Sequence, residues 1–89
     1  MNNSDKYYIK LIKEGDVSSY SILVDRYKQD LFDIISDKAD NSTVAEEITK
    51  ATFVKAFGMI VDGELNANFK NQIINIAQDF LNTGENEKK

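Results

Sequence analysis

The 89-residue chain contains no cysteine, no histidine and no proline. Without cysteine it can form neither disulfides nor thiolate metal sites, although this absence is neutral on the redox compartment. Without histidine it lacks the usual proton shuttle and the commonest metal ligand. Any metal site would therefore have to be built from carboxylates alone. These absences favour a non-enzymatic domain without a cofactor.

Long apolar runs are also absent. No run approaches the ~18 residues that a membrane span needs, and the polar segment Met1 to Lys6 is followed by no apolar signal core. The hydrophobic content of 42% is ordinary for a globular domain. A chain of this length forms one domain that buries about 60–65% of its unfolded surface. We therefore expect a single soluble domain in the cytoplasm, without a membrane partner.

Basic residues are fewer than acidic residues in this chain. The chain has 11 Lys and Arg against 15 Asp and Glu, a formal net charge of -4. Phosphate contacts need Lys and Arg, so this balance argues against simple nucleic-acid binding. Mild acidity also has a plainer explanation, because it keeps a small protein soluble.

No arrangement of carboxylates predicts catalysis. Glu46 and Glu47 are adjacent, so on a helix their side chains point about 100° apart. Asp25, Asp30 and Asp33 are typical of a solvated helix face. General acid–base chemistry needs two positioned carboxylates, and neither a glycine-rich phosphate loop nor a nucleophile elbow is present. The sequence thus predicts no enzyme and no metal site.

Three of the four glycines separate segments in which apolar residues recur with helical spacing. Gly15, Gly63 and Gly84 fall between periodic runs, whereas Gly58 lies inside one and weakens that helix by about 1 kcal/mol relative to alanine. Four helices are expected, over Asp5 to Glu14, from after Asp16 to about Ala39, from Thr43 to about Val61, and from Asn66 to Asn82. No segment alternates with period two. The expected fold is an all-α, compact four-helix domain over residues 1–84, with a frayed tail over 85–89.

Capping signals and apolar stripes support these helices. Ser4 and Asp16 are expected to cap the first two helices, and Thr43 with Glu46 forms a capping box for the third. Apolar residues recur at spacings of three and four and form the expected core: Tyr8, Leu11 and Ile12; Tyr20, Leu23, Val24, Tyr27, Leu31, Ile34 and Ile35; Ala45, Ile48, Thr52, Phe53, Ala56, Phe57 and Ile60; and Phe69, Ile73, Ile74, Ile76, Ala77, Phe80 and Leu81.

The segment Ala45 to Phe57 reads Ala-Glu-Glu-Ile-Thr-Lys-Ala-Thr-Phe-Val-Lys-Ala-Phe. It resembles the central helix of the bacterial extracytoplasmic-function (ECF) sigma factors, whose pattern is Ala-Glu-Asp-Leu-Val-Gln-Glu/Asp-Thr-Phe. The run from Leu11 to Tyr27 resembles the start of the same domain. Phe69 to Asp79 falls where the family has Phe-x-x-Trp-Leu-x-x-Ile-Ala-x-Asn. The resemblance covers about residues 8–83 and implies the promoter-melting, polymerase-binding domain known as sigma region 2.

This resemblance implies a role in transcription initiation. The third helix would bind the clamp helices of RNA polymerase, and the loop and last helix would contact the promoter -10 element. The implied polymerase-binding residues are Glu46, Glu47, Lys50, Ala51 and Val54. The implied DNA-binding residues are Asn66, Asn68, Lys70, Asn71, Asn75 and Gln78.

The chain departs from the family at polar positions. The family's Gln is Lys50 and the acid after it is Ala51, while on the last helix Trp is Gln72 and Asn is Asp79. Between residues 62 and 87 one lysine stands against five acids, a local net charge of -4. Gripping a single strand needs positive charge and stacking aromatics, so we expect promoter binding to be weak.

Two alternatives remain open at this stage. The chain is a stand-alone protein-interaction module of the same fold without DNA binding, or a helical partner protein of another role. An anti-sigma protein or another regulator is a further expected partner. The sequence ends where the family's linker and C-terminal helix-turn-helix domain would begin, so no such domain is expected within these residues.

Overall fold

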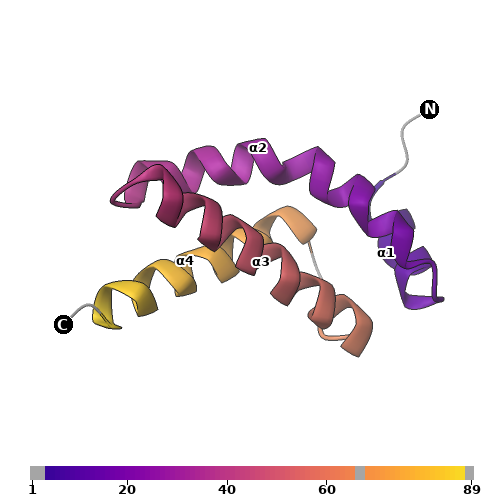
Figure 1. Cartoon of the computed structure of the whole chain (residues 1–89). Helices are drawn as coiled ribbons and strands as arrows, with labels where there is room; N and C mark the ends of the chain where they lie inside the picture. The colour runs from indigo at the N-terminus through magenta and orange to yellow at the C-terminus, as the bar shows by residue number, and fades with distance from the viewer. Residues whose placement is uncertain (1–3, 66–67, 88–89) are drawn as a thin grey trace.

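The computed structural model describes residues 4–65 and 68–87, with side chains through Thr83. Within these residues the fold is entirely helical, which confirms the all-α class (Figure 1). The elements are α1 (Asp5–Lys13), the short 3-10 helix η1 (Val17–Ser19), α2 (Tyr20–Lys38), α3 (Ser42–Asp62) and α4 (Phe69–Glu87). The four α-helices are those that the sequence predicts.

The three long helices form the body of the domain. α3 packs against both α2 and α4, and the short α1 packs against α2 and α3. In Figure 1, α1 and the C-terminal end of α4 lie at opposite ends of the molecule, whose longest dimension is 42 Å. α3 thus contacts all three other α-helices, and residues such as Glu47, Lys50 and Val54 on its remaining side are exposed.

The core follows the predicted stripes closely. Its buried apolar residues are Ile9, Ile12, Leu23, Leu31, Ile35, Ala45, Phe53, Ala56, Ile60, Leu65, Phe69, Ile73, Ile76 and Ala77. Periodicity did not predict Ile9 or Leu65. The other apolar residues expected in the core are only half-buried: Tyr8, Leu11, Tyr20, Val24, Tyr27, Ile34, Ile48, Phe57, Ile74, Phe80 and Leu81. The Thr52 hydroxyl is fully buried and has no hydrogen-bond partner among the described residues.

Tyr20 joins three helices at the centre of the domain. Its hydroxyl donates to the Phe53 carbonyl at 2.6 Å. Its ring lies 5.1 Å from that of Phe57 and 6.2 Å from that of Phe69, centroid to centroid. Burial raises the pKa of the Tyr20 phenol above its ordinary value. A buried tyrosine needs such a partner for its hydroxyl, and here the partner ties α2 to α3.

Helix starts differ in detail from the sequence expectation. Ser4 caps α1 as expected, accepting from the Tyr7 N–H at 3.4 Å. Asp16 instead precedes η1, and its carboxylate accepts from the hydroxyls of Ser18 and Ser19, so α2 begins at Tyr20. These hydrogen bonds lower the pKa of Asp16. A local side-chain network has here replaced a helix cap.

The capping box expected at Thr43 is wrong. Asn41 caps α3, because its Oδ1 accepts from the Val44 N–H at 2.9 Å, and the helix already begins at Ser42. Asparagine is among the best capping residues, and its use places Thr43 inside the first turn. Gly63 ends α3 in the left-handed conformation (φ 77°), as glycine commonly does.

The last helix starts later and ends later than expected. α4 begins at Phe69 rather than Asn66, and the Asn68 Oδ1 accepts from the Asn71 N–H at 3.0 Å, the geometry of a helix cap. It continues through Gly84 to Glu87. Glycine weakens a helix but does not forbid it, so Gly84 is not the end that the sequence suggested.

Candidate docking face on α3 and amide stripe on α4

The five residues implied as polymerase contacts lie together on the outer side of α3. Glu46, Glu47, Lys50 and Val54 are exposed and Ala51 is half-buried. They share this side because the buried stripe of α3 occupies the opposite arc of the same helix, at 3.6 residues per turn. We call these five residues the docking face.

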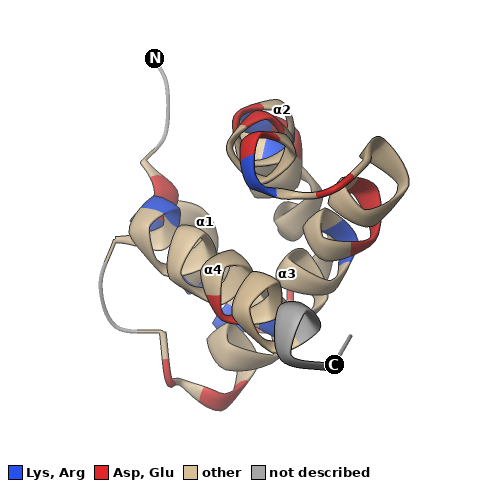
Figure 2. Ribbon diagram, turned by 90° about the vertical axis from the view of Figure 1, so that its left-hand side faces the viewer, with Lys and Arg blue, Asp and Glu red and all other residues tan. Residues whose placement is uncertain are grey.

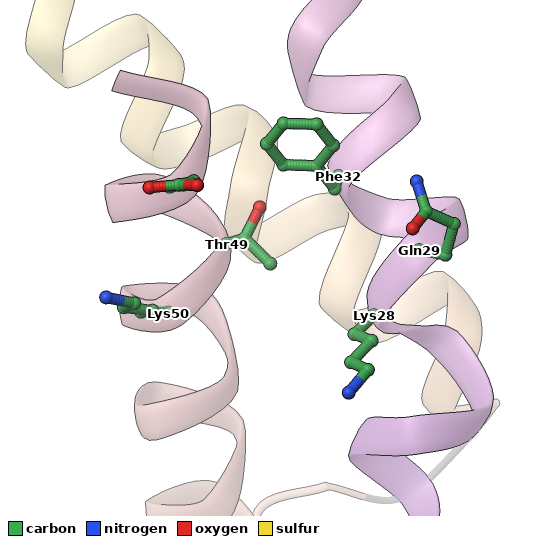
Figure 3. A pocket seen from close by; sticks show the side chains of 6 residues that line it. Lys28, Gln29, Phe32, Thr49 and Lys50 are labelled. Carbon is green, nitrogen blue, oxygen red and sulfur yellow. The ribbon is translucent and has the colours of Figure 1, made fainter. Parts of the chain in front are cut away.

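A groove of about 410 Å³ runs beside the docking face, between α2 and α3 (Figure 3). Its lining comprises Lys28, Gln29, Phe32, Glu46, Thr49 and Lys50. In Figure 3, Phe32 projects from α2 into the space between the two helices, and Thr49 lies across from it on α3. Two docking-face residues thus share a concavity with three residues of α2.

The α2 lining of this groove was missed by sequence reasoning. Phe32 is half-buried and lies beside the core stripe of α2, not within it. An aromatic residue off the main stripe is the one signal that would have indicated a second apolar surface on this helix. Lys28 and Gln29 carried no signal, because exposed polar residues of this kind occur on any solvated helix face.

Hydrogen bonds hold the polar lining to its own helices. Thr49 donates its hydroxyl to the Ala45 carbonyl at 2.7 Å, and Gln29 donates to Asp33 at 3.0 Å. Lys28 forms an exposed ion pair with Asp25 at 3.2 Å. The groove therefore has the Phe32 ring at its floor and charged residues of both signs, Lys28, Lys50 and Glu46, at its edges. Such a groove suits a side chain of a protein partner; it offers no reactive group.

Four of the six residues implied as DNA contacts lie on one stripe of α4, and Lys70 lies apart from them. Asn71, Asn75 and Gln78 are exposed at spacings of four and three, so they follow Asn68 along one stripe of α4. We call these four the amide stripe. The capping role of Asn68 already uses its side-chain oxygen. Asn66 lies outside the described residues.

Lys70 is separated from the amide stripe. It is about 100° from Asn71 around the helix axis, and it lines a crevice against α2 with Tyr27 and Asp30. From Phe69 to Thr83 the only charged residues of α4 are Lys70 and Asp79, and the α4 ribbon in Figure 2 is accordingly almost free of charge colour. The amide stripe therefore has no cation within it.

The described part of the chain offers neither a metal site nor a membrane-spanning helix. Over residues 4–65 and 68–87, no group of three or more acidic side chains is arranged to hold a metal ion. Across the same residues, every helix is too short or too polar to cross a bilayer.

The chain is similar in sequence to the ECF RNA polymerase sigma factor SigW of Bacillus subtilis (strain 168), with 28% identity over 75 residues. The aligned part covers 84% of this chain and 40% of SigW, so the chain spans about two fifths of the length of this relative. No family model and no solved structure matches the chain. The comparison supports a distant relation to sigma factors.

Proposed function

We propose that the chain is a sigma-factor-like transcription initiation domain that binds the clamp helices of bacterial RNA polymerase through the docking face. One observation carries the proposal. The residues that match the family's clamp-contact positions lie together on the exposed side of α3, within the segment that is similar to SigW. A domain with this role acts in the cytoplasm.

The chemistry of the docking face suits a helical partner. Val54 is 73% exposed, and the charged residues Lys50 and Glu47 lie one and two turns before it, respectively. Apolar anchors ringed by charge are typical of helix-to-helix docking, in which the charges set register and exclude wrong partners. The adjacent groove adds an aromatic surface at Phe32 for one partner side chain.

Promoter contact is the weaker half of the proposal. The amide stripe can hydrogen-bond base edges, but nearly all nonspecific affinity for DNA comes from cations at phosphates. Because Lys70 lies about 100° from Asn71 around the helix axis, the stripe itself contains no cation to supply that attraction. This observation favours a second candidate function, a protein-interaction module of the same fold that binds polymerase or an anti-sigma protein without DNA.

Binding to isolated clamp helices tests the proposal. We expect the wild-type chain to bind and Glu47→Arg to weaken binding at least about tenfold, or ~1.4 kcal/mol. The matched control is Glu14→Arg, the same change at an exposed residue at the end of α1, where a cation is favourable. Equal binding by both variants, or none by the wild type, would contradict docking through α3.

A further inference from the structure

The C-terminal half of α3 exposes an apolar strip that begins at Val54, the last residue of the docking face, and continues past it. Val54 is 73% exposed and Val61 is 54% exposed, and the exposed Gly58 lies between them on the same face at spacings of four and three. Among the described residues, none covers Val54 or Val61. Spacings of this kind are those by which one helix presents its side to another.

A shallow trough of about 580 Å³ borders this strip, between α3 and the start of α2. Its apolar lining comes from Val17, Tyr20, Val24 and Phe57. Val17 is 55% exposed on η1. Phe57 lies one turn from both Val54 and Val61, so it connects the trough to the strip. We call the strip and trough together the apolar end surface.

Gly58 has no role in the packing of the domain itself. A Cβ built at this residue would meet no atom within 4 Å, and its φ is not positive. Yet glycine costs about 1 kcal/mol relative to alanine inside a helix. A bare backbone at the middle of an exposed apolar strip allows a partner to approach α3 closely.

Acidic residues border the apolar end surface. Asp25 lines the trough, and Asp16 precedes the η1 turn that forms its edge. Asp62 and Glu64 follow Val61 at the C-terminal end of α3, where the helix carbonyls add further negative potential. Three lysines lie beside these residues. Lys28 is paired with Asp25, and Lys55, which follows Val54, has its Nζ 5.9 Å from the centroid of the Phe80 ring on α4. Lys50 lies one turn before Val54.

The acidic residues around the apolar end surface indicate which kind of partner can bind there. A second copy in a two-fold contact would bring the same acidic borders together, which repel. Nucleic acid and anionic lipid headgroups are repelled for the same reason. We propose that the apolar end surface binds a basic amphipathic helix of a partner protein, whose apolar side covers Val54, Phe57 and Val61 and whose Lys or Arg side chains meet the acidic border. This site shares Val54 with the docking face but does not require polymerase binding.

A synthetic helix provides the probe. It has about 18 residues, long enough to be helical, with leucine on one side, lysine on the other and one tryptophan among the leucines. Because the chain contains no tryptophan, fluorescence of the peptide reports binding directly. We expect binding that weakens with salt, and weaker binding still to a peptide in which glutamate replaces every lysine.

Two variants locate the site. Gly58→Leu should weaken peptide binding at least about tenfold while the thermal midpoint stays level or rises, because leucine is a much better helix former than glycine. Ser36→Leu, at an exposed residue on α2, is its matched control. Asp25→Lys should also weaken binding, whereas Asp37→Lys, the same change elsewhere on α2, should not.

Several outcomes would overturn the proposal. These are no binding to the wild type, equal binding to Gly58→Leu, and equal affinity for the glutamate peptide. Self-association of the wild type that Gly58→Leu abolishes would instead assign the surface to a second copy, and so would also overturn it. Although the two sites share Val54, Glu47→Arg should weaken peptide binding much less than Asp25→Lys does, which separates this site from the clamp-binding proposal.

Discussion

The Tyr27 hydroxyl on α2 donates a 2.5 Å hydrogen bond to Oδ2 of Asp5 on α1. The other oxygen of the same carboxylate pairs with Arg26 at 2.7 Å. Two neighbouring residues of α2 thus hold one residue in the first turn of α1. A nine-residue helix is too short to be stable alone, so α1 depends on this contact and on the burial of Ile9 and Ile12.

Removal of the Asp5 carboxylate should therefore loosen α1. We expect Asp5→Ala to lower the free energy of unfolding by about 1–2 kcal/mol, because it removes a charge-assisted hydrogen bond and a partly buried ion pair. Asp25→Ala breaks only the exposed pair with Lys28 and should cost less than about 0.5 kcal/mol. Urea unfolding measures both, and equal losses would contradict a special role for Asp5.

The same contact predicts an alkaline limit to stability. Burial, and then the hydrogen bond to Asp5, raises the pKa of Tyr27 from 10.0 to about 12. Because the folded pKa is the higher one, this contribution is complete below pH 10 and is lost as pH rises towards 12. Urea midpoints across this range should fall less steeply for Tyr27→Phe than for the wild type. If the urea midpoints of Tyr27→Phe and the wild type fall equally steeply with pH, Tyr27 is not the group whose ionisation destabilises the fold. The titrating group would then be Tyr20.

The buried hydroxyl of Thr52 is an uncompensated polar group. Thr52 is fully buried and lacks a partner in the described part of the chain. Thr52→Val keeps the shape and removes the hydroxyl, so we expect the free energy of unfolding to rise by about 1 kcal/mol. Thr49→Val, which removes a hydroxyl bonded to Ala45, should bring no such gain. A destabilised Thr52→Val protein would show that the hydroxyl has a partner after all.

Two glycines of α3 should respond oppositely to alanine. Gly58 has helical surroundings and open space for a Cβ, so Gly58→Ala should stabilise the domain by about 1 kcal/mol. Gly63 has a φ of 77°, which strains any residue with a Cβ, so Gly63→Ala should destabilise by a similar amount. Thermal unfolding of the Gly58→Ala and Gly63→Ala proteins measures both changes in stability. A Gly58→Ala protein less stable than the wild type would mean that α3 is distorted there.

Single-stranded DNA provides the last test. We expect no salt-sensitive binding of the wild-type chain to single-stranded promoter DNA, because the amide stripe has no cation within it. Asn75→Lys with Gln78→Lys would place two cations in the stripe and should create such binding. Ser36→Lys with Asp37→Lys adds lysines on α2 as the control. Micromolar, salt-dependent binding by the wild type would refute the charge argument.

The exposure of the docking face could be predicted from sequence, whereas its role as a polymerase contact comes from the family resemblance alone and stays a prediction. Apolar spacing of three and four indicates which side of a helix is buried, and the exposed side follows by elimination; Glu47, Lys50 and Val54 lie where this rule puts them. The same rule predicted the buried positions of Thr52, Ala56 and Ile73. It works because the helical period depends only on backbone geometry, which is local.

Which neighbour each helix face meets was decided only by the tertiary structure. Lys70, which the resemblance implies as a DNA contact, is exposed and also lines a crevice between α4 and α2. Phe32 lies at the floor of a groove because α3 packs beside α2 there. The Tyr20 hydroxyl donates to the carbonyl of Phe53, which is 33 residues away in the sequence. Periodicity specifies an angle around one helix axis, whereas these contacts depend on how separate axes cross, and that follows from packing of the whole core.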